Sequence, residues 1–349
     1  MVDAERGRTE SRPEAFKLGT PVSELYRDPA GYDPGEDLEA AVRVALLLGL
    51  PLLLTGEPGC GKTSVAYWLA WKLQLGGPQH RDYPLVYNVK SISTGRDLLY
   101  EFDELDRFRD SQPGAQRKPT ESYLRLNALG RAILFSAEHN KPVRDGPLTY
   151  SDLVSRQAED GLSRGMRFGR RHVVLIDELD KAPRDTPNDL LLEIEEMRFR
   201  IRELDAWVDG APERRPIVVI TSNSEKSLPE PFLRRCVFHH IRSPDDARRR
   251  DIVSRRQHPF AQRSELFDGA MRFFDVLHGS PEHPPELGRP PGTAELLAWL
   301  TVLEERASRP KGEVLRGLKG IVRHTLGTLA KTKEDMERAE AVMVREGLD

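Results

Sequence analysis

Short, continuously apolar segments alternate with segments of helical character through the first two thirds of the chain. The apolar segments are PLLLT at 51–55, PLVYNV at 84–89, HVVLIDELD at 172–180 and PIVVITSN at 216–223. The helical segments between them are SVAYWLAWKL at 64–73, GRDLLYEFDELDRF at 95–108 and residues 188–198. Strands that are apolar throughout are buried on both faces, and helical connections join parallel strands. The pattern therefore predicts an α/β fold, a parallel sheet with helices on both faces.

Two features depart from this simple alternation. Before the first strand, DLEAAVRVALLL at 37–48 predicts a helix that stops at Gly49 and has an unusually broad apolar face. Between about 106 and 170 the chain becomes long and polar, which predicts an insertion rather than one connection. Within the insertion, LGRAILFSAE at 129–138 predicts a helix.

The last third of the chain has no strand pattern. Thr293 is placed to cap a helix, and Thr332 with Asp335 has the spacing of a capping box. Apolar residues at helical spacing follow these caps or lie between them: Leu296, Leu300, Leu303, Leu315, Leu318, Val322 and Leu329. We therefore predict three parts, an N-terminal tail at 1–18, an α/β domain at 19–242 with the insertion, and a smaller all-helical domain at 243–349.

Composition narrows the class of protein. Of 349 residues 38% are hydrophobic, enough for a real core, and 53 basic against 56 acidic residues give a net charge of −3. That balance offers no general attraction to nucleic acid or to an anionic membrane. Two cysteines imply no disulfide framework, and the charged N-terminus is no signal peptide. The apolar block at 44–54 is too short to span a bilayer, so we expect a cytoplasmic protein without a membrane partner.

The stretch GEPGCGKT at 56–63 has the spacing G-x-x-x-x-G-K-[ST] and lies between a predicted strand and a predicted helix. Its glycines let backbone N–H groups turn toward phosphate oxygens, and the helix N-terminus favours the anion. Lys62 would reach the β and γ phosphates of ATP, and the Thr63 hydroxyl would hold Mg²⁺. The predicted nucleotide-binding residues of the loop are Gly56, Glu57, Pro58, Gly59, Cys60, Gly61, Lys62, Thr63 and Ser64.

Two acids, Asp177 and Glu178, follow the apolar residues of the third strand. Ligands of such sheets bind at the carboxyl ends of the strands. We expect Asp177 to hold Mg²⁺ through water and Glu178 to orient and polarise an attacking water. Since a small-molecule kinase does not need this second carboxylate, Glu178 favours hydrolysis. Asp180 and Lys181 resemble an ordinary surface ion pair, and we assign them no role.

Further polar residues follow the last predicted strand. Asn223 stands at its tip, where a side-chain amide can hydrogen-bond the attacking water or the γ-phosphate. Arg234 and Arg235 come eleven residues later in LPEPFLRRC. An arginine against a γ-phosphate stabilises the transition state and can come from a neighbouring subunit. The alternative for either arginine is a solvated basic pair at a helix end.

Taken in order, GEPGCGKT, VVLIDELDKA, VVITSN and LPEPFLRR resemble the motifs of an AAA+ ATPase of the MoxR-like branch. The resemblance covers residues 19–242 well and the helical remainder in general shape. It implies an αβα P-loop domain followed by a helical lid, assembled as a homo-oligomeric ring, usually a hexamer, with ATP between subunits. It also implies a hairpin insert in the second helix and another hairpin at 199–216, before sensor 1.

The resemblance also assigns roles to single residues. Lys62 and Thr63 match Walker A, Asp177 and Glu178 match Walker B, Asn223 matches sensor 1, and Arg234 or Arg235 matches the arginine finger. In the lid, a sensor 2 arginine usually stands at the start of a helix, in a P-R context. This chain has GRPPGTAELLAWL there, which leaves Arg289 as the candidate.

The leading functional hypothesis is an ATP-hydrolysing ring that remodels or activates a partner protein. MoxR-like ATPases often act beside partners with a von Willebrand factor A domain, and some relatives occur in bacterial conflict systems. The alternative is a nucleic-acid motor or loader. Acidic residues interspersed among the basic ones and the lack of an aromatic stacking platform argue against it. A nucleotide-gated scaffold with little turnover is a third possibility.

Overall fold

The structure is a computed structural model. It describes residues 28–75, 83–113, 118–146, 148–155, 168–223, 228–256, 259–262, 264–279, 283–306 and 319–348. The predicted tail at 1–18 lies outside these segments, as do Leu315 and Leu318 of the predicted helical stripe. Within the described segments, no helix is both long and apolar enough to cross a membrane.

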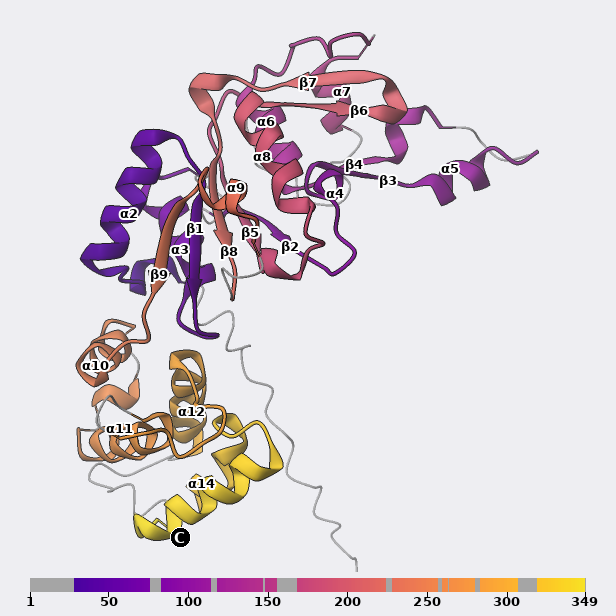
Figure 1. The fold of residues 1–349 in the computed structure, drawn as a ribbon. Helices are drawn as coiled ribbons and strands as arrows, with labels where there is room; N and C mark the ends of the chain where they lie inside the picture. The colour runs from indigo at the N-terminus through magenta and orange to yellow at the C-terminus, as the bar shows by residue number, and fades with distance from the viewer. Residues whose placement is uncertain are drawn as a thin grey trace, which may run out of the picture.

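A five-stranded parallel sheet forms the centre of the first domain, in the order β2-β5-β8-β1-β9 (Figure 1). The strands are β1 (Leu52–Gly56), β2 (Leu85–Asn88), β5 (Val173–Asp177), β8 (Ile217–Thr221) and β9 (Val237–Ile241). The first four lie in the segments that the apolar pattern predicts. The fifth was not predicted, because its sequence VFHHI contains two histidines and alternates between half-buried and exposed residues.

Helices cover both faces of this sheet, as the pattern predicts. On one face, α2 (Gly35–Leu48) and α3 (Lys62–Lys72) pack with Leu52 and Leu54 of β1. On the other face, Leu53 of β1 packs in a core with helices α4, α6 and α8. The bounds of these three are Gly95–Leu99, Ala128–Ser136 and Thr186–Glu196. Because side chains alternate along a strand, one apolar run supplies both cores.

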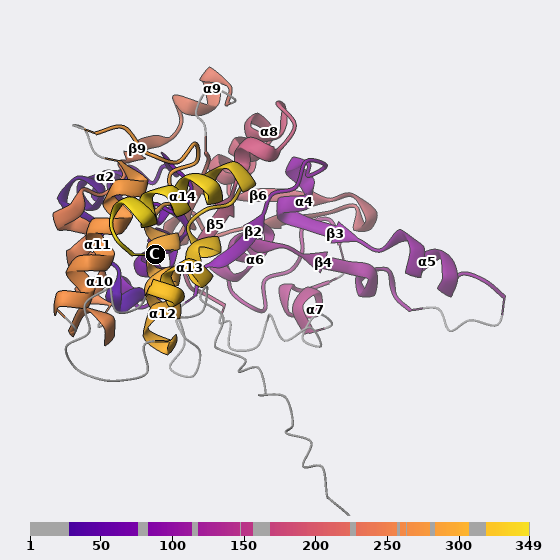
Figure 2. The same ribbon diagram turned by 90° about the horizontal axis from the view of Figure 1, so that it is seen from below.

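The first part of the predicted insertion, together with the strand before it, forms an arm that projects from the body of the domain (Figures 1 and 2), whereas α6 of the same segment packs on the sheet. The arm is an antiparallel pair of strands, β3 (Tyr100–Phe102) and β4 (Leu124–Leu126), with α5 (Glu104–Asp110) and η2 (Thr120–Tyr123) between them. The expectation of one helix over 95–108 is therefore wrong. Tyr100 is buried, its ring stacks on Phe199 at 6.3 Å, and its hydroxyl accepts from the Arg202 N–H at 3.0 Å. These long-range contacts hold the chain extended.

The remaining elements of the first domain lie around the sheet. The α6 helix confirms the helix expected at 129–138, and α7 (Tyr150–Ser155) follows it. A second antiparallel hairpin, β6 (Arg198–Ile201) with β7 (Ala206–Asp209), lies where one was expected before the β8 strand. The short elements are η1 (Pro29–Gly31), η4 (Leu179–Lys181), η5 (Arg202–Leu204), η6 (Pro212–Arg214) and α9 (Glu230–Leu233).

Every described secondary-structure element of the C-terminal region is a helix, and the region has a core of its own. Its elements are α10 (Asp246–Arg255), η8 (Pro259–Gln262), α11 (Ser264–His278), α12 (Thr293–Arg306), α13 (Lys319–Thr325), η10 (Leu326–Thr328) and α14 (Lys333–Arg345). Trp299 lies fully buried in this core and donates its indole N–H to the Thr325 hydroxyl at 2.9 Å. Thr332 caps α14 by accepting from the Asp335 N–H at 3.1 Å, as its spacing predicts.

Candidate functional site

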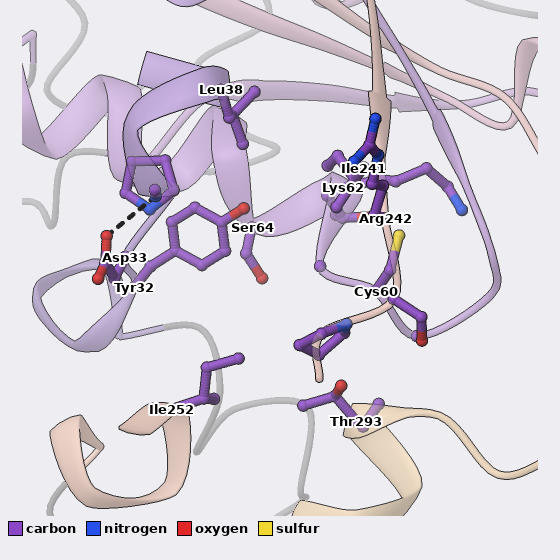
Figure 3. A pocket seen from close by; sticks show the side chains of 18 of the residues that line it. Tyr32, Asp33, Leu38, Cys60, Lys62, Ser64, Ile241, Arg242, Ile252 and Thr293 are labelled. Carbon is purple, nitrogen blue, oxygen red and sulfur yellow. Dashed lines mark hydrogen bonds between the residues drawn. The ribbon is translucent and has the colours of Figure 1, made fainter. Parts of the chain in front are cut away.

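A cavity of about 1310 Å³ lies between the carboxyl edge of the sheet and the helical region (Figure 3). Its walls come from the phosphate loop, the ends of β5 and β8, the segment before α2, and helices α10 and α12. The predicted residues among its lining are Pro58, Gly59, Cys60, Gly61, Lys62, Thr63, Ser64, Asp177, Glu178 and Asn223. The fold thus gathers residues that are up to 165 positions apart in the chain, from Pro58 to Asn223, around one space.

The phosphate loop needs its glycines for two separate reasons. Gly59 and Gly61 have φ of 79° and 96°, in the left-handed region that L side chains rarely adopt. A Cβ atom on Gly56 would lie 2.5 Å from the backbone oxygen of Ile241, on the neighbouring strand β9. The loop therefore turns tightly against β9, and α3 begins directly after it at Lys62.

Lys62 is held inside the loop that precedes it. Its ammonium donates to the backbone oxygens of Gly56 at 2.7 Å and Glu57 at 3.0 Å, and only 8% of the residue is exposed. Gly56 and Glu57 thus contribute their carbonyl groups, whereas the loop from Pro58 onward lines the cavity. The positive charge already lies where a phosphate would enter, at the N-terminus of α3.

The residues predicted to hold magnesium lie close together. The Thr63 hydroxyl donates to the two carboxylate oxygens of Asp177 at 3.2 and 3.4 Å. Mg²⁺ prefers oxygen ligands, keeps several waters and is usually bound by one or two protein groups together with substrate phosphates. A hydroxyl next to a carboxylate at the edge of a phosphate loop fits that requirement. Within the described residues, no cluster of three or more His, Cys, Asp or Glu suits another metal.

Glu178 adopts an uncommon backbone conformation and forms an ion pair. Its φ and ψ are 61° and 48°, in the left-handed region. Its carboxylate accepts from the Lys181 ammonium at 2.5 Å, and this hydrogen bond raises the pKa of Lys181. The turn η4 places Lys181 beside Glu178, since the Lys181 N–H donates to the Glu178 backbone oxygen at 3.0 Å. Sequence reasoning gave Lys181 no role and missed this contact.

Thr221, Asn223 and Asp180 connect β8 to the two acids. The buried Thr221 hydroxyl donates to the Asp177 carboxylate at 2.6 Å and accepts from the Glu178 N–H at 2.9 Å. The Asn223 N–H donates to the Asp180 carboxylate at 3.1 Å. The backbone of Asn223 is thus tied to the turn that follows Glu178. Asp180 was missed because a DE-x-D pattern alone gives no sign of this long-range bond.

The segment before α2 joins the phosphate loop to the helical region. The Tyr32 ring lies against Gly61, where a Cβ atom would be 3.3 Å from Cε2, and burial raises the pKa of its phenol. Asp33 accepts from Arg248 at 2.9 Å and pairs with Arg255 at 3.1 Å, both on α10. The hydrogen bond from Arg248 lowers the pKa of Asp33. Nothing in the sequence pattern pointed to these contacts.

The structure places Arg234 and Arg235 outside this cavity. Both side chains are largely exposed, at 75% and 51%. Arg234 pairs with Glu230 one turn earlier, and Arg235 pairs with Glu195 of α8 at 3.5 Å. Together with Glu230 they line a separate shallow pocket. Within one chain, therefore, the arginine pair and the phosphate loop belong to different surfaces.

The two remaining predicted residues are Arg289 and Cys60. Arg289 is exposed, and it is not among the described residues that line the cavity. Instead, Thr293 and Ala294 at the start of α12 reach the cavity (Figure 3 labels Thr293), and Gly292 approaches the loop so closely that a Cβ atom would lie 2.9 Å from the Pro58 oxygen. Cys60 is a free, half-buried thiol, and burial raises its pKa. A protonated thiol is a poor nucleophile.

Comparison with known proteins gives a family match and two similar structures. Residues 52–244 match the model of a family described as ATPase family associated with various cellular activities (AAA). Among solved structures, the RuvB P216G mutant of Thermotoga maritima is 15% identical, with a TM-score of 0.41, over 89% of this chain and 70% of that one. NtrX from Brucella abortus in complex with ATP is 14% identical, with a TM-score of 0.45, over 93% and 70%. No curated protein sequence matches the chain.

Proposed function

This chain belongs to the AAA ATPase family, and on that premise we propose that it is a MoxR-like member that hydrolyses ATP in a homo-oligomeric ring to remodel or activate a partner protein. The observation that carries the proposal is the convergence of Lys62, Asp177 and Glu178 on one cavity. A cation for phosphates, a carboxylate for the metal and a second carboxylate for water are the groups that hydrolysis requires.

ATP binding follows from the phosphate loop. The Lys62 ammonium exchanges its bonds to the loop carbonyls for bonds to the β and γ phosphates, and the loop N–H groups take up the remaining oxygens. Thr63 and Asp177 would hold Mg²⁺, which neutralises phosphate charge when bound. We expect the base and ribose in the part of the cavity that Tyr32 and the helices α10 and α12 line.

Hydrolysis needs a base that is free to accept a proton. In this structure the Glu178 carboxylate is neutralised by Lys181, so it has to leave that ion pair before it polarises a water. Asn223 orients the same water or the γ-phosphate. Because Asp180 fixes the backbone of Asn223 and η4 carries both Asp180 and Lys181, a shift of this turn would act on both catalytic groups.

A ring is proposed because the two candidate arginine-finger residues do not line the described cavity of their own chain, whose arginines are Arg242, Arg248, Arg255 and Arg256. Arg234 and Arg235 are exposed on another surface, so a second copy could place one of them in the cavity. A hexamer is the ring size that the MoxR-like branch suggests. Arg289 remains a candidate sensor 2 only if the helical region rearranges on binding ATP, since it lies outside the cavity here.

A polypeptide is the partner that we propose, with a von Willebrand factor A protein as the first candidate and a bacterial conflict system as one setting. The projecting arm supports this choice, because Leu105 and Phe108 of α5 are 71% and 66% exposed there. The net charge of −3 makes nucleic acid the less suitable partner. The two free cysteines suit a reducing compartment, and we propose the cytoplasm.

Steady-state ATPase of the native protein and of Glu178→Gln tests the proposal. We expect Glu178→Gln to lose turnover by about 10²-fold or more while it still binds ATP, because a carboxamide cannot accept the proton. Glu104→Gln makes the same chemical change on the exposed arm and should retain the native rate. Equal turnover in native protein and Glu178→Gln would contradict hydrolysis at this site, and stimulation by DNA that weakens with salt would favour a nucleic-acid motor.

A further inference from the structure

Thr221 is the last residue of β8, and it stands beside the first of the two acids. Strands β5 and β8 are parallel neighbours in which Ile176 pairs with Ile220, so Thr221 follows next to Asp177. Its side chain is 1% exposed. A buried hydroxyl at this place has to find hydrogen-bond partners, because an unsatisfied one is costly.

The two bonds of this hydroxyl determine its orientation. The Glu178 N–H can only donate, so Thr221 Oγ1 accepts from it, at 2.9 Å. The hydroxyl proton is then directed to the carboxylate of Asp177, at 2.6 Å. One hydroxyl therefore fixes the side chain of the first acid and the backbone of the second.

The backbone bond matters because of the conformation of Glu178. A non-glycine residue in the left-handed region is strained unless its surroundings hold it there. This conformation ends β5 and begins the turn η4, and so it sets the direction in which the Glu178 side chain leaves the strand. Without the acceptor on Thr221, the Glu178 N–H would lose the partner that holds this turn.

The bond to Asp177 differs from the one that Thr63 makes to the same carboxylate. Thr63 donates at 3.2 and 3.4 Å from an exposed hydroxyl, whereas Thr221 donates at 2.6 Å from a buried one. If the Thr63 oxygen were to bind a metal ion, the hydrogen bond from Thr221 would still hold the carboxylate in place. A hydrogen bond from behind a metal-binding carboxylate orients it and affects its affinity.

We propose that Thr221 is a positioning residue of the ATPase site, which orients Asp177 toward the metal and Glu178 toward the attacking water. This inference rests on the proposed function and adds a residue to it. Although Thr221 lines the cavity, its hydroxyl is bonded to the two acids, and we propose that it acts through them. Loss of its hydroxyl should therefore slow turnover and weaken the response to Mg²⁺, with little effect on ATP binding.

The test compares Thr221→Val, which keeps the shape and removes the hydroxyl, with Thr221→Ser, which keeps the hydroxyl and removes a methyl group. We expect Thr221→Val to lower kcat by about tenfold or more and to raise the Mg²⁺ concentration for half-maximal rate several-fold. The KM for ATP should change by less than about twofold at saturating Mg²⁺. Thr221→Ser should restore both kcat and the Mg²⁺ response to near-native values.

Several outcomes would overturn the proposal. Native kcat and native Mg²⁺ response in Thr221→Val would do so, and so would an equal loss in Thr221→Ser, since packing of the methyl group would then explain both. If Thr221→Val does not fold, Thr221→Cys replaces it in the test. Because a thiol is a weak hydrogen-bond donor, the kcat of Thr221→Cys should lie between that of Thr221→Ser and complete loss of activity. Glu178→Gln runs in parallel: if it is as active as native protein the proposed function fails, whereas an inactive Glu178→Gln with a fully active Thr221→Val removes only the role of Thr221.

Discussion

The carboxyl edge of the sheet and the α9 surface offer two opposite environments for residues of the same predicted site. At the sheet edge, Lys62 is 8% exposed and bonds to two carbonyl groups of its own loop. At α9, Arg234 and Arg235 are largely exposed and pair with single carboxylates. The first group is fixed by the fold, and the second is held by contacts that cost little to break.

The difference has a topological cause. Strands β1, β5 and β8 are neighbours in the sheet, so the residues that follow each of them meet at one edge regardless of their distance in the chain. The α9 helix lies between β8 and the edge strand β9 in the chain, and Arg234 and Arg235, which directly follow it, do not line the cavity. If the arginines act on ATP as proposed, a second copy of the chain has to bring them to the cavity, and the proposed ring would do so.

The strongest way to test this comparison is to remove the arginines. Replacing both Arg234 and Arg235 by alanine should lower the ATPase rate by about 10³-fold, because an arginine at the γ-phosphate is worth that much in related phosphoryl transfers. ATP binding, measured with a fluorescent analogue, should change little, since neither residue lines the cavity of its own chain. The two single variants then show which arginine acts.

A mixing experiment provides the control. Subunits with Lys62→Ala bind ATP poorly but keep the arginines, and subunits with both arginines replaced keep the cavity. Mixing two inactive proteins should restore part of the activity if the arginines act between subunits. Full turnover in the double arginine variant, or turnover by a strict monomer, would contradict the divided site.

A smaller effect is expected at the ion pair on the sheet edge. Lys181→Met removes the ammonium that neutralises Glu178, so the carboxylate becomes available to water and basal turnover should rise by about two- to fivefold. The matched control is Lys331→Met, because Lys331 is also exposed but contacts only backbone oxygens of the helical region. A lower rate in Lys181→Met would show that this lysine supports catalysis rather than restraining the base.

The smallest effect concerns the contact between the two domains. Asp33→Asn should weaken the bonds to Arg248 and Arg255 and lower the free energy of unfolding by about 1 kcal/mol at neutral pH. Denaturant unfolding measures this change, and a double-mutant cycle with Arg248→Ala isolates the pair. The expected coupling is favourable, and a value near zero would show that the bridge contributes nothing to joining the helical region to the cavity.

Much of the fold could be predicted because its signals are local. Four strands appear as continuous apolar runs, and α6 and the Thr332 cap of α14 depend on neighbouring residues. The β9 strand was missed because an edge strand with exposed histidines has no such run. The helix predicted over 95–108 was wrong because Tyr100 finds partners, Phe199 and Arg202, about a hundred positions away. Helical propensity is a weak preference that such contacts override.

By itself, the sequence predicted which groups gather at the cavity, since GEPGCGKT and the acids at 177 and 178 each carry their chemistry within a few residues. Only the tertiary structure decided how those groups are held. Thr221 hydrogen-bonds to both acids, Lys181 forms an ion pair with Glu178, and Asp33, beside the cavity, pairs with Arg248 of α10. The physical reason is that a hydrogen bond depends on distance and direction in space, and residues far apart along the chain satisfy both only after strands pair and helices pack.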